Sequence, residues 1–174
     1  MGQMGADVLK NNLANAARTY QWDFQIPAPV GTGDTDVWLL RAQNVHIPGK
    51  SFEDIHIDYK ATGGYNIPGR EQYDHIFPVT LLEGEDALGF TAINSWMEQI
   101  RSAVGGTGSP DASLKTDAVL TMTDEQENPW LAIKLVGIYP KSVDNVDLNY
   151  NSSGVVKFSV TFSYDRWENM TVSS

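Results

Sequence analysis

The sequence has no cysteine among its 174 residues. Disulfide scaffolds, zinc–thiolate sites, iron–sulfur clusters and thiol nucleophiles are therefore excluded. Positive charge is also scarce, because 12 lysines and arginines stand against 22 aspartates and glutamates, giving a formal charge of −10. The basic residues are scattered singly, whereas tight binding to phosphates requires clusters of them. The composition argues against a protein that binds nucleic acid tightly.

Long apolar runs are missing as well. The N-terminal segment has no apolar core of the signal-peptide type. The longest apolar-rich stretch, residues 130–140, is short and contains Lys134, so we expect no membrane insertion. Hydrophobic residues still make up 41% of the chain, which is enough to bury a core. The length fits one folded domain of ordinary size.

Alternation of apolar and polar residues predicts most of the secondary structure. Pro78 lies inside one alternating segment and indicates an edge or a bulge there. Val156, Phe158, Val160 and Phe162 mark the clearest segment, which we expect to be one strand. A long hairpin is expected to join 52–60 through a glycine turn to 67–71, and residues 141–154 are expected to form a polar connection. The other expected strands cover residues 20–26, 36–42, 75–84, 117–124, 129–140 and 154–168.

Residues 86–104 change to a helical period. Apolar residues recur at helical spacing, with Asp86 as a candidate N-cap and Gly105 at the C-terminal end. The expected apolar stripe consists of Phe90, Ile93, Trp96, Met97, Ile100 and Val104. The fold class is therefore mainly β (α+β): an antiparallel β-sandwich or barrel with one flanking helix. Residues 1–19 are expected to form a short helix or arm, 20–168 the β domain and 169–174 a polar tail.

No motif in the chain favours catalysis or a cofactor. Gly49-Lys50-Ser51 has Asn44 where a phosphate-binding loop needs a glycine, and a β-period segment follows instead of a helix. His56 and Asp58 share a strand face, but two ligands are too few for a metal site. The acidic residues before the helix complement its dipole, and the other acidic clusters fit turns. We expect no enzyme activity, no metal and no cofactor.

Four segments, in this order, carry a resemblance to a known family: 20–29, 37–100, 131–150 and 155–168. Their features include a G-x-aromatic-P turn at Gly137, Tyr139 and Pro140, and an aromatic–acidic pair at Trp167 and Glu168. The chain resembles the tail tube proteins of contractile-tailed (myovirus-type) bacteriophages. The resemblance covers roughly residues 20–168 and implies a small β-sandwich or barrel with one flanking helix.

The resemblance also implies an assembly. Hexameric rings would stack into a hollow tube, to which each subunit contributes four strands of a continuous inner barrel. DNA would pass through without specific binding. The partners would be the tail sheath, the baseplate or tube initiator and the tape-measure protein. The protein would be assembled in the host cytoplasm and lie in the tail of the virion.

A simple estimate agrees with this role. About 24 strands, spaced about 4.8 Å apart and tilted by about 40°, close a barrel about 150 Å in circumference with a bore approaching about 40 Å. Duplex DNA fits such a bore without contact. A wall that offers few cations would not retain phosphates, and a formal charge of −10 suits that task.

Polar strand faces are the candidates for lining the channel, and at least one of two sets should do so. The first choice, because it is more acidic, is Asp54, His56, Asp58 and Lys60; the second is Lys157, Ser159, Thr161 and Ser163. Candidates for contact between rings lie in the N-terminal arm and at the hairpin tip: Val8, Leu9, Leu13, Ala61, Thr62, Gly63 and Gly64.

Other functions stay open at this point. The same fold would serve the inner tube of a related contractile injection system that delivers a toxin, or a baseplate subunit that initiates the tube as a single ring. A protein of a different class, a monomeric β-barrel that binds a small ligand, would have an apolar cavity and the mass of one subunit in solution.

Overall fold

The computed structural model describes residues 17–26, 41–60, 63–102, 114–146, 148 and 154–172. Within them, nine strands and one helix follow one another: β1 (Trp22–Gln25), β2 (Ala42–Asn44), β3 (Lys50–Asp58), β4 (Gly64–Tyr73), β5 (Ile76–Leu82), α3 (Leu88–Ser102), β6 (Thr116–Thr123), β7 (Pro129–Val143), β8 (Lys157–Ser163) and β9 (Arg166–Met170). The predicted arm, up to residue 16, and residues 36–40 of the predicted second strand lie outside the described residues.

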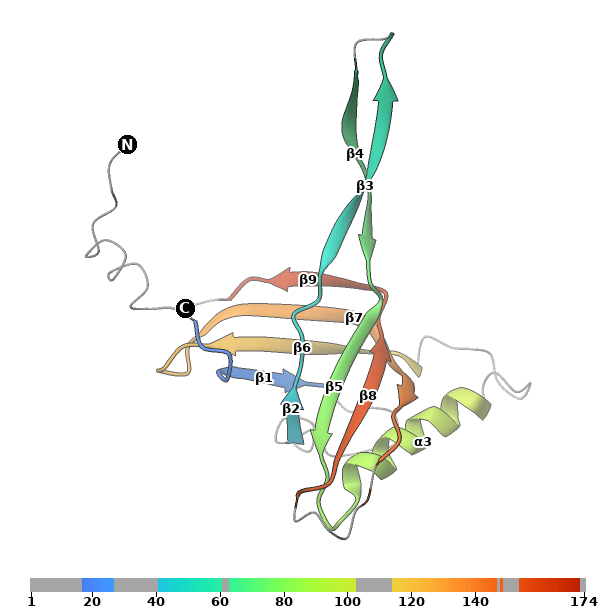
Figure 1. The fold of residues 1–174 in the computed structure, drawn as a ribbon. Helices are drawn as coiled ribbons and strands as arrows, with labels where there is room; N and C mark the ends of the chain where they lie inside the picture. Colours follow the sequence, from blue (N-terminus) through green and yellow to red (C-terminus); the bar gives the residue numbers. More distant parts are fainter. Residues whose placement is uncertain are drawn as a thin grey trace.

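The body of the protein consists of two antiparallel sheets that share the long strand β7 (Figure 1). The N-terminal part of β7 pairs with β6 and β9, and β1 extends this β6 sheet. The C-terminal part of β7 pairs with β8, and β5 and β2 extend this β8 sheet. Gly137, at a positive φ of 69°, lies where β7 changes partners, and a Cβ there would collide with the carboxylate of Asp165.

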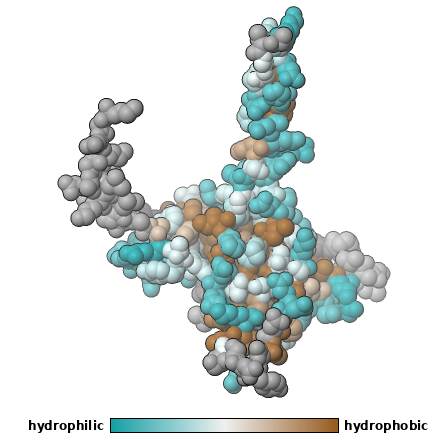
Figure 2. Space-filling view, viewed as in Figure 1, coloured by the Kyte–Doolittle hydropathy of each residue, from teal (hydrophilic) through white to brown (hydrophobic). Residues whose placement is uncertain are grey.

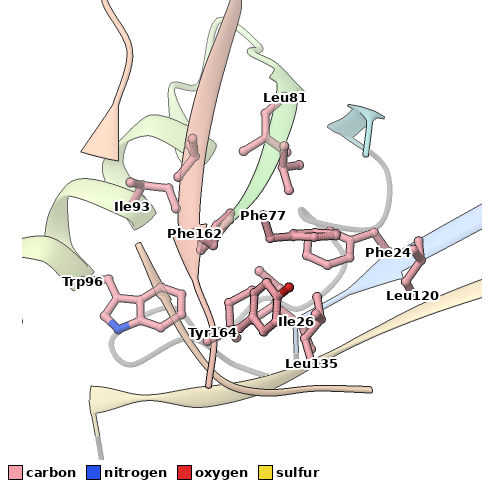
Figure 3. Packing of buried hydrophobic residues seen from close by; sticks show 14 of the residues in the cluster. Phe24, Ile26, Phe77, Leu81, Ile93, Trp96, Leu120, Leu135, Phe162 and Tyr164 are labelled. Atoms are coloured by element: carbon pink, nitrogen blue, oxygen red, sulfur yellow. The ribbon is translucent and has the colours of Figure 1, made fainter. Parts of the chain in front are cut away.

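The core lies between these two sheets and the helix. Phe24, Leu120 and Leu135 come from the β6 sheet, while Phe77 and Phe162 come from the β8 sheet (Figure 3). Each of these side chains is at most 1% exposed, and burial of such a side chain stabilises the fold by about 1.5–3 kcal/mol. The alternation seen in the sequence therefore reflects one buried face on each sheet.

Helix α3 packs on the inner face of the β8 sheet, as its apolar period predicts. Ile93 and Trp96 are fully buried, and the Trp96 Nε1–H donates to the carbonyl oxygen of Leu114 at 2.7 Å. Phe90 was expected in the buried stripe, and this prediction is wrong: its side chain is 41% exposed. It lies at the margin of the stripe, where its ring meets Phe158 edge-on at 5.9 Å between centroids.

Strand β5 lies between β8 and β2, yet it accommodates a proline. The three residues of β2 oppose only Thr80 and Leu81 of β5. Pro78 therefore has a described neighbour on one side only, namely Thr161 of β8. A proline has no N–H to donate to a ladder and is tolerated where a strand lacks a neighbour, so the expectation of a local edge agrees with the pairing.

The prediction of one strand over 154–168 is wrong. The chain turns at Tyr164 and Asp165, so that β8 and β9 join different sheets. The alternation conceals this turn because Tyr164, after the end of β8, still points into the core at 1% exposure. The prediction of a connection from residue 141 also needs correction, since Ser142 and Val143 continue β7 by pairing with β8.

Strands β3 and β4 form the predicted long hairpin, which rises from the body in Figure 1. They pair with each other as a separate two-stranded sheet. The hairpin is continuous in sequence with β2 and β5 but extends beyond the β8 sheet.

Candidate functional site

The hairpin formed by β3 and β4 has one apolar and one polar face. The pairing of the two strands decides which side chains share a face. Ile55 lies opposite Ile67 and Ile57 opposite Tyr65 on one face. Closer to the body the register shifts, and an extra residue on β4 forms a bulge near Gly69. A Cβ on Gly69 would approach the Glu53 carbonyl oxygen to 2.9 Å, so only glycine fits this close approach of the two strands.

The apolar face of the outer hairpin is exposed. Ile55 is 50% exposed, Ile57 37%, Tyr65 57% and Ile67 38%, and Tyr59 beyond them is 66% exposed. The hairpin stands clear of the body in Figure 2. A two-stranded sheet that leaves its apolar face in water is marginally stable on its own, and a contiguous exposed apolar patch marks an interaction site. This face is suited to burial against another surface.

The opposite face of the hairpin is polar. His56 lies between two oxygen atoms, with Nε2 3.0 Å from Asp58 Oδ1 and Nδ1 2.7 Å from Asn66 Oδ1. Asp54 shares this face and lies opposite Pro68. The structure thus brings Asp54, His56 and Asp58 together on one face of the hairpin, as predicted, and this hairpin projects from the body. Lys60 follows the end of β3.

The second candidate set lies on the outer face of β8. Ser159, Thr161 and Ser163 are half-buried and point away from the core, while Phe158, Val160 and Phe162 between them are buried. Across the strand pair, Thr80 Oγ1 and Ser159 Oγ are 3.2 Å apart. Lys157, at the start of β8, is the one charged member of this set. The outer face of β8 is therefore a band of neutral hydroxyl groups with a single cation at its end.

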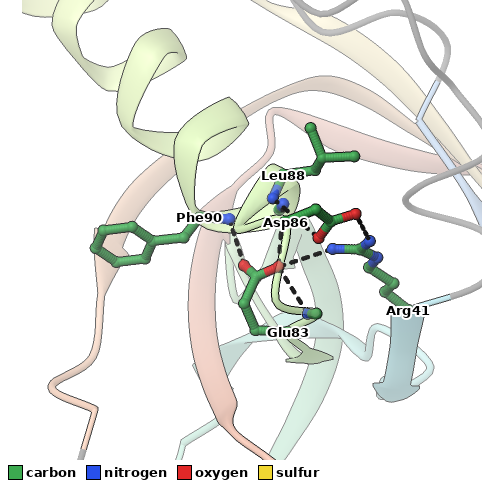
Figure 4. Close-up of polar contacts among 7 residues, drawn as sticks. Arg41, Glu83, Asp86, Leu88 and Phe90 are labelled. Atoms are coloured by element: carbon green, nitrogen blue, oxygen red, sulfur yellow. Dashed lines mark hydrogen bonds and ion pairs between the residues drawn. The ribbon is translucent and has the colours of Figure 1, made fainter.

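A polar network connects Arg41, the residue just before β2, to the start of α3 (Figure 4). Arg41 donates to Glu83 Oε1 at 2.7 Å and to Asp86 Oδ2 at 2.6 Å. Glu83 also accepts the backbone N–H groups of Gly89 at 3.4 Å and Phe90 at 2.6 Å. The predicted cap Asp86 accepts the N–H of Leu88 at 3.4 Å. The sequence missed the larger role of Glu83 because this residue lies five positions before the helix begins.

Electrostatics in this network favour the charged forms. The hydrogen bond from Arg41 lowers the pKa of the Asp86 carboxyl below its ordinary value, and the same bond raises the pKa of Arg41. The ion pairs fasten the start of α3 to β2, so the network stabilises the fold and carries no reaction.

The remaining candidates can be placed only in part. Gly63, at a φ of 110°, and Gly64 lie at the hairpin tip, as predicted. Val8, Leu9, Leu13, Ala61 and Thr62 lie outside the described residues. Among the residues that the structure describes, no group of three or more histidines and carboxylates is close enough to hold a metal ion. In the same part of the chain, no helix is long and apolar enough to cross a membrane.

Comparison with solved structures places the fold among tube and tube-associated proteins. A chain in the baseplate of the anti-feeding prophage is 10% identical, with a TM-score of 0.67 over 91% of this chain and 97% of that one. A chain in the extended sheath–tube complex of an extracellular contractile injection system, PVC, is 14% identical, with a TM-score of 0.63 over 93% and 97%. A chain in the tube-terminating cap of the anti-feeding prophage is 17% identical, with a TM-score of 0.64 over 89% and 91%. These likenesses concern the fold.

Sequence comparison identifies the family. No curated protein matches this chain. The family model described as phage tail tube protein matches residues 13–170, which is most of the chain and includes every described strand. The two-sheet body, the flanking helix and the projecting hairpin are the structural counterpart of that match. The chain belongs to the phage tail tube protein family, and its role is that of a structural, non-enzymatic component of a tail tube.

Proposed function

We propose that this protein forms hexameric rings that stack into the inner tube of a contractile tail, through which the genome is delivered. The observation that carries the stacking is the hairpin, whose apolar face is uncovered and which pairs with no other described strand. A second copy stacked above the first would cover this face. Contacts that repeat head to tail build an open-ended assembly, which is what a tube requires.

Six-fold symmetry is supported by two similar structures. The anti-feeding prophage baseplate is described as 6-fold symmetrised. The tail of an empty GTA particle, refined with C6 symmetry, contains a chain that matches with a TM-score of 0.52 at 9% identity, over 90% of this chain and 100% of that one. By analogy, sheath, baseplate and terminator would be the partners of this protein in the assembled tail. A tape-measure protein inside the tube and assembly in the host cytoplasm belong to the same proposal.

We propose the outer face of β8 as part of the channel wall. It lies on the continuous sheet formed by β7, β8, β5 and β2, and a closed inner barrel requires such a sheet from every subunit. Its hydroxyl groups offer no fixed negative or positive charge along most of the strand. The polar face of the hairpin, with Asp54 and Asp58, would extend the wall toward the next ring and repel phosphates.

Electron microscopy of the purified protein tests the stacking. The parent protein should form tubes, or six-fold rings at low concentration. The double variant Ile57→Asp and Ile67→Asp should give rings that do not stack, because it places two charges on the apolar face. The matched control, Asp54→Asn on the opposite face, should still give tubes. Tubes of normal length from the double variant, or a compact monomer from the parent protein, would refute the proposal.

A second candidate function is the inner tube of an injection system that delivers protein. It is favoured by the fold similarity to the sheath–tube complex of PVC. The cargo separates the two candidates: DNA in intact particles supports the phage tail, and protein cargo supports the injection system.

A further inference from the structure

The root of the hairpin is attached to one corner of the body. That corner is the turn between β8 and β9, at Tyr164 and Asp165, with Trp167 just beyond it in β9. The first strand of the hairpin begins at Lys50, and the second ends at Tyr73. Both ends contact this corner, although it lies about a hundred positions away along the chain.

The β3 side of the root is held by Trp167. Its indole Nε1–H donates to the carbonyl oxygen of Gly49 at 3.2 Å. The ammonium group of Lys50 lies over the same ring, 4.9 Å from its centroid. A cation in this position is attracted to the face of the indole ring. Trp167 itself is half-buried and packs against the core, so its position is fixed by the body.

A second set of contacts ties the two strands of the root together. Lys50 forms an ion pair with Glu71 at 2.9 Å and lies opposite Tyr73 in the first pair of the ladder. The hydrogen bond with Glu71 raises the pKa of Lys50, so the cation over Trp167 is maintained. The contact of Lys50 with Trp167 therefore also holds β4, through the ion pair with Glu71.

The β4 side of the root is held by His75. Its Nδ1 lies 2.9 Å from the carbonyl oxygen of Tyr164. Because a carbonyl oxygen only accepts, Nδ1 carries the proton in this contact. The His75 ring lies 6.1 Å from Tyr73 and 6.0 Å from Tyr164, centroid to centroid. His75 has a φ of 55°, unusual for a residue other than glycine, and this conformation turns the chain from the hairpin into β5.

We propose that Trp167, with Lys50 and His75, forms a root clamp that fixes the direction of the hairpin before the subunits assemble. Among the described strands, the hairpin shares no ladder with the body sheets, so without the clamp its direction would depend on its two chain connections and on the packing of Tyr73 against the core. A hairpin that already points in the docking direction loses less conformational entropy when it binds. This last step rests on the proposed stacking, whereas the fixed direction does not.

The fixed direction can be measured on the full-length, unassembled protein. The chain has no cysteine, so two introduced cysteines carry the only spin labels. The labels are placed at Asp58→Cys on the hairpin and Gln25→Cys on β1, and double electron–electron resonance gives the distances between them. The parent protein should give one narrow distribution. Trp167→Leu should give a broad one, because it removes both the indole donor and the ring under Lys50.

Trp130→Leu is the matched control. Trp130 is also a partly exposed tryptophan, and its Nε1–H also donates to a backbone carbonyl, that of Thr123 at 3.1 Å. It lies on β7, and none of its described interactions reaches the hairpin root. Its variant should keep the narrow distribution. If Trp167→Leu fails to fold by circular dichroism, the milder double variant Trp167→Phe and Lys50→Gln takes its place, since it keeps an aromatic ring.

Assembly gives the second readout. If only about 10–30% of hairpins point in the docking direction, the critical concentration for tubes should rise about three- to tenfold. A narrow distribution in the Trp167 variants, or an equally broad one in the parent protein or in Trp130→Leu, would overturn the clamp. A broad distribution with an unchanged critical concentration would overturn its role in assembly. If the parent protein forms no tubes at all, the proposed function fails, but the spin-label result still decides the clamp.

Discussion

Arg41 and Glu83 form an ion pair at 2.7 Å, in which the Glu83 side chain is only 9% exposed. The same carboxylate accepts the N–H groups at the start of α3, so one side chain joins β2 to the helix.

Glu83→Ala should therefore destabilise the protein by about 1–3 kcal/mol, because it uncaps the helix and leaves Arg41 without one of its partners. Urea denaturation followed by circular dichroism measures this loss. Glu85→Ala, an exposed neighbour with no contact to the helix amides among the described interactions, is the control and should change stability by less than about 0.5 kcal/mol. Equal effects of the two substitutions would contradict the capping role.

Acid should weaken the same network through Asp86. Arg41 lowers the pKa of Asp86 in the folded protein from its ordinary 3.8, so folding is favoured while this carboxyl is ionised. The contribution is fully present above the unfolded pKa and is lost as pH falls through the lower folded value. Thermal melts of the parent protein and of Asp86→Asn between about pH 7 and 2 should therefore converge at the acid end. A stability difference that stays constant over this range would argue against the ion pair.

Lysine substitutions can distinguish the two proposed channel surfaces. Cations on a surface that the DNA passes should bind phosphates and slow ejection. Ser159→Lys with Thr161→Lys places two cations on β8, and Asp54→Lys with Asp58→Lys places two on the hairpin. Both variants should form tubes, and genome ejection from assembled particles should be slower for the surface that lines the channel. Ejection rates equal to the parent's in both variants would exclude both surfaces.

The N-terminal arm is tested by deletion. Removing residues 1–15 should leave the described body intact, since β1 begins at Trp22. Rings should still form but should not stack. Light scattering and electron microscopy measure this, and tubes of ordinary length from the shortened protein would show that the arm has no part in stacking.

Most of the body could be predicted from the sequence because burial has a period there. Phe24 in β1, Ile93 in α3 and Phe162 in β8 lie on the faces that alternation and helical spacing indicate. The boundary between β8 and β9 could not be found this way. Tyr164, in the turn, is buried like the apolar residues of β8 before it, so the alternation continues through the turn. Phe90 was wrongly expected to be buried for a related reason. The helical period shows which side of the helix is apolar, but not how much of that side the sheet covers.

For the candidate surfaces, the sequence predicts which residues share a face but not where in the fold that face lies. The alternation of Asp54, His56 and Asp58 is correct, but a sequence does not say whether a strand joins a larger sheet or projects from it. Contacts over long separations, such as Trp167 with Gly49 or Arg41 with Glu83, leave no local signal. They depend on tertiary packing, which the alternation of residues along the chain does not encode.

The sharing of β7 by both sheets has a mechanical consequence. In a sandwich whose layers are joined only by loops, a sideways force can shear one layer over the other by breaking side-chain packing alone. Here one uninterrupted backbone crosses between the layers, with hydrogen bonds to β6 and β9 on its first half and to β8 on its second. The subunit should therefore deform as one solid piece under a load along the tube, without slip between its layers.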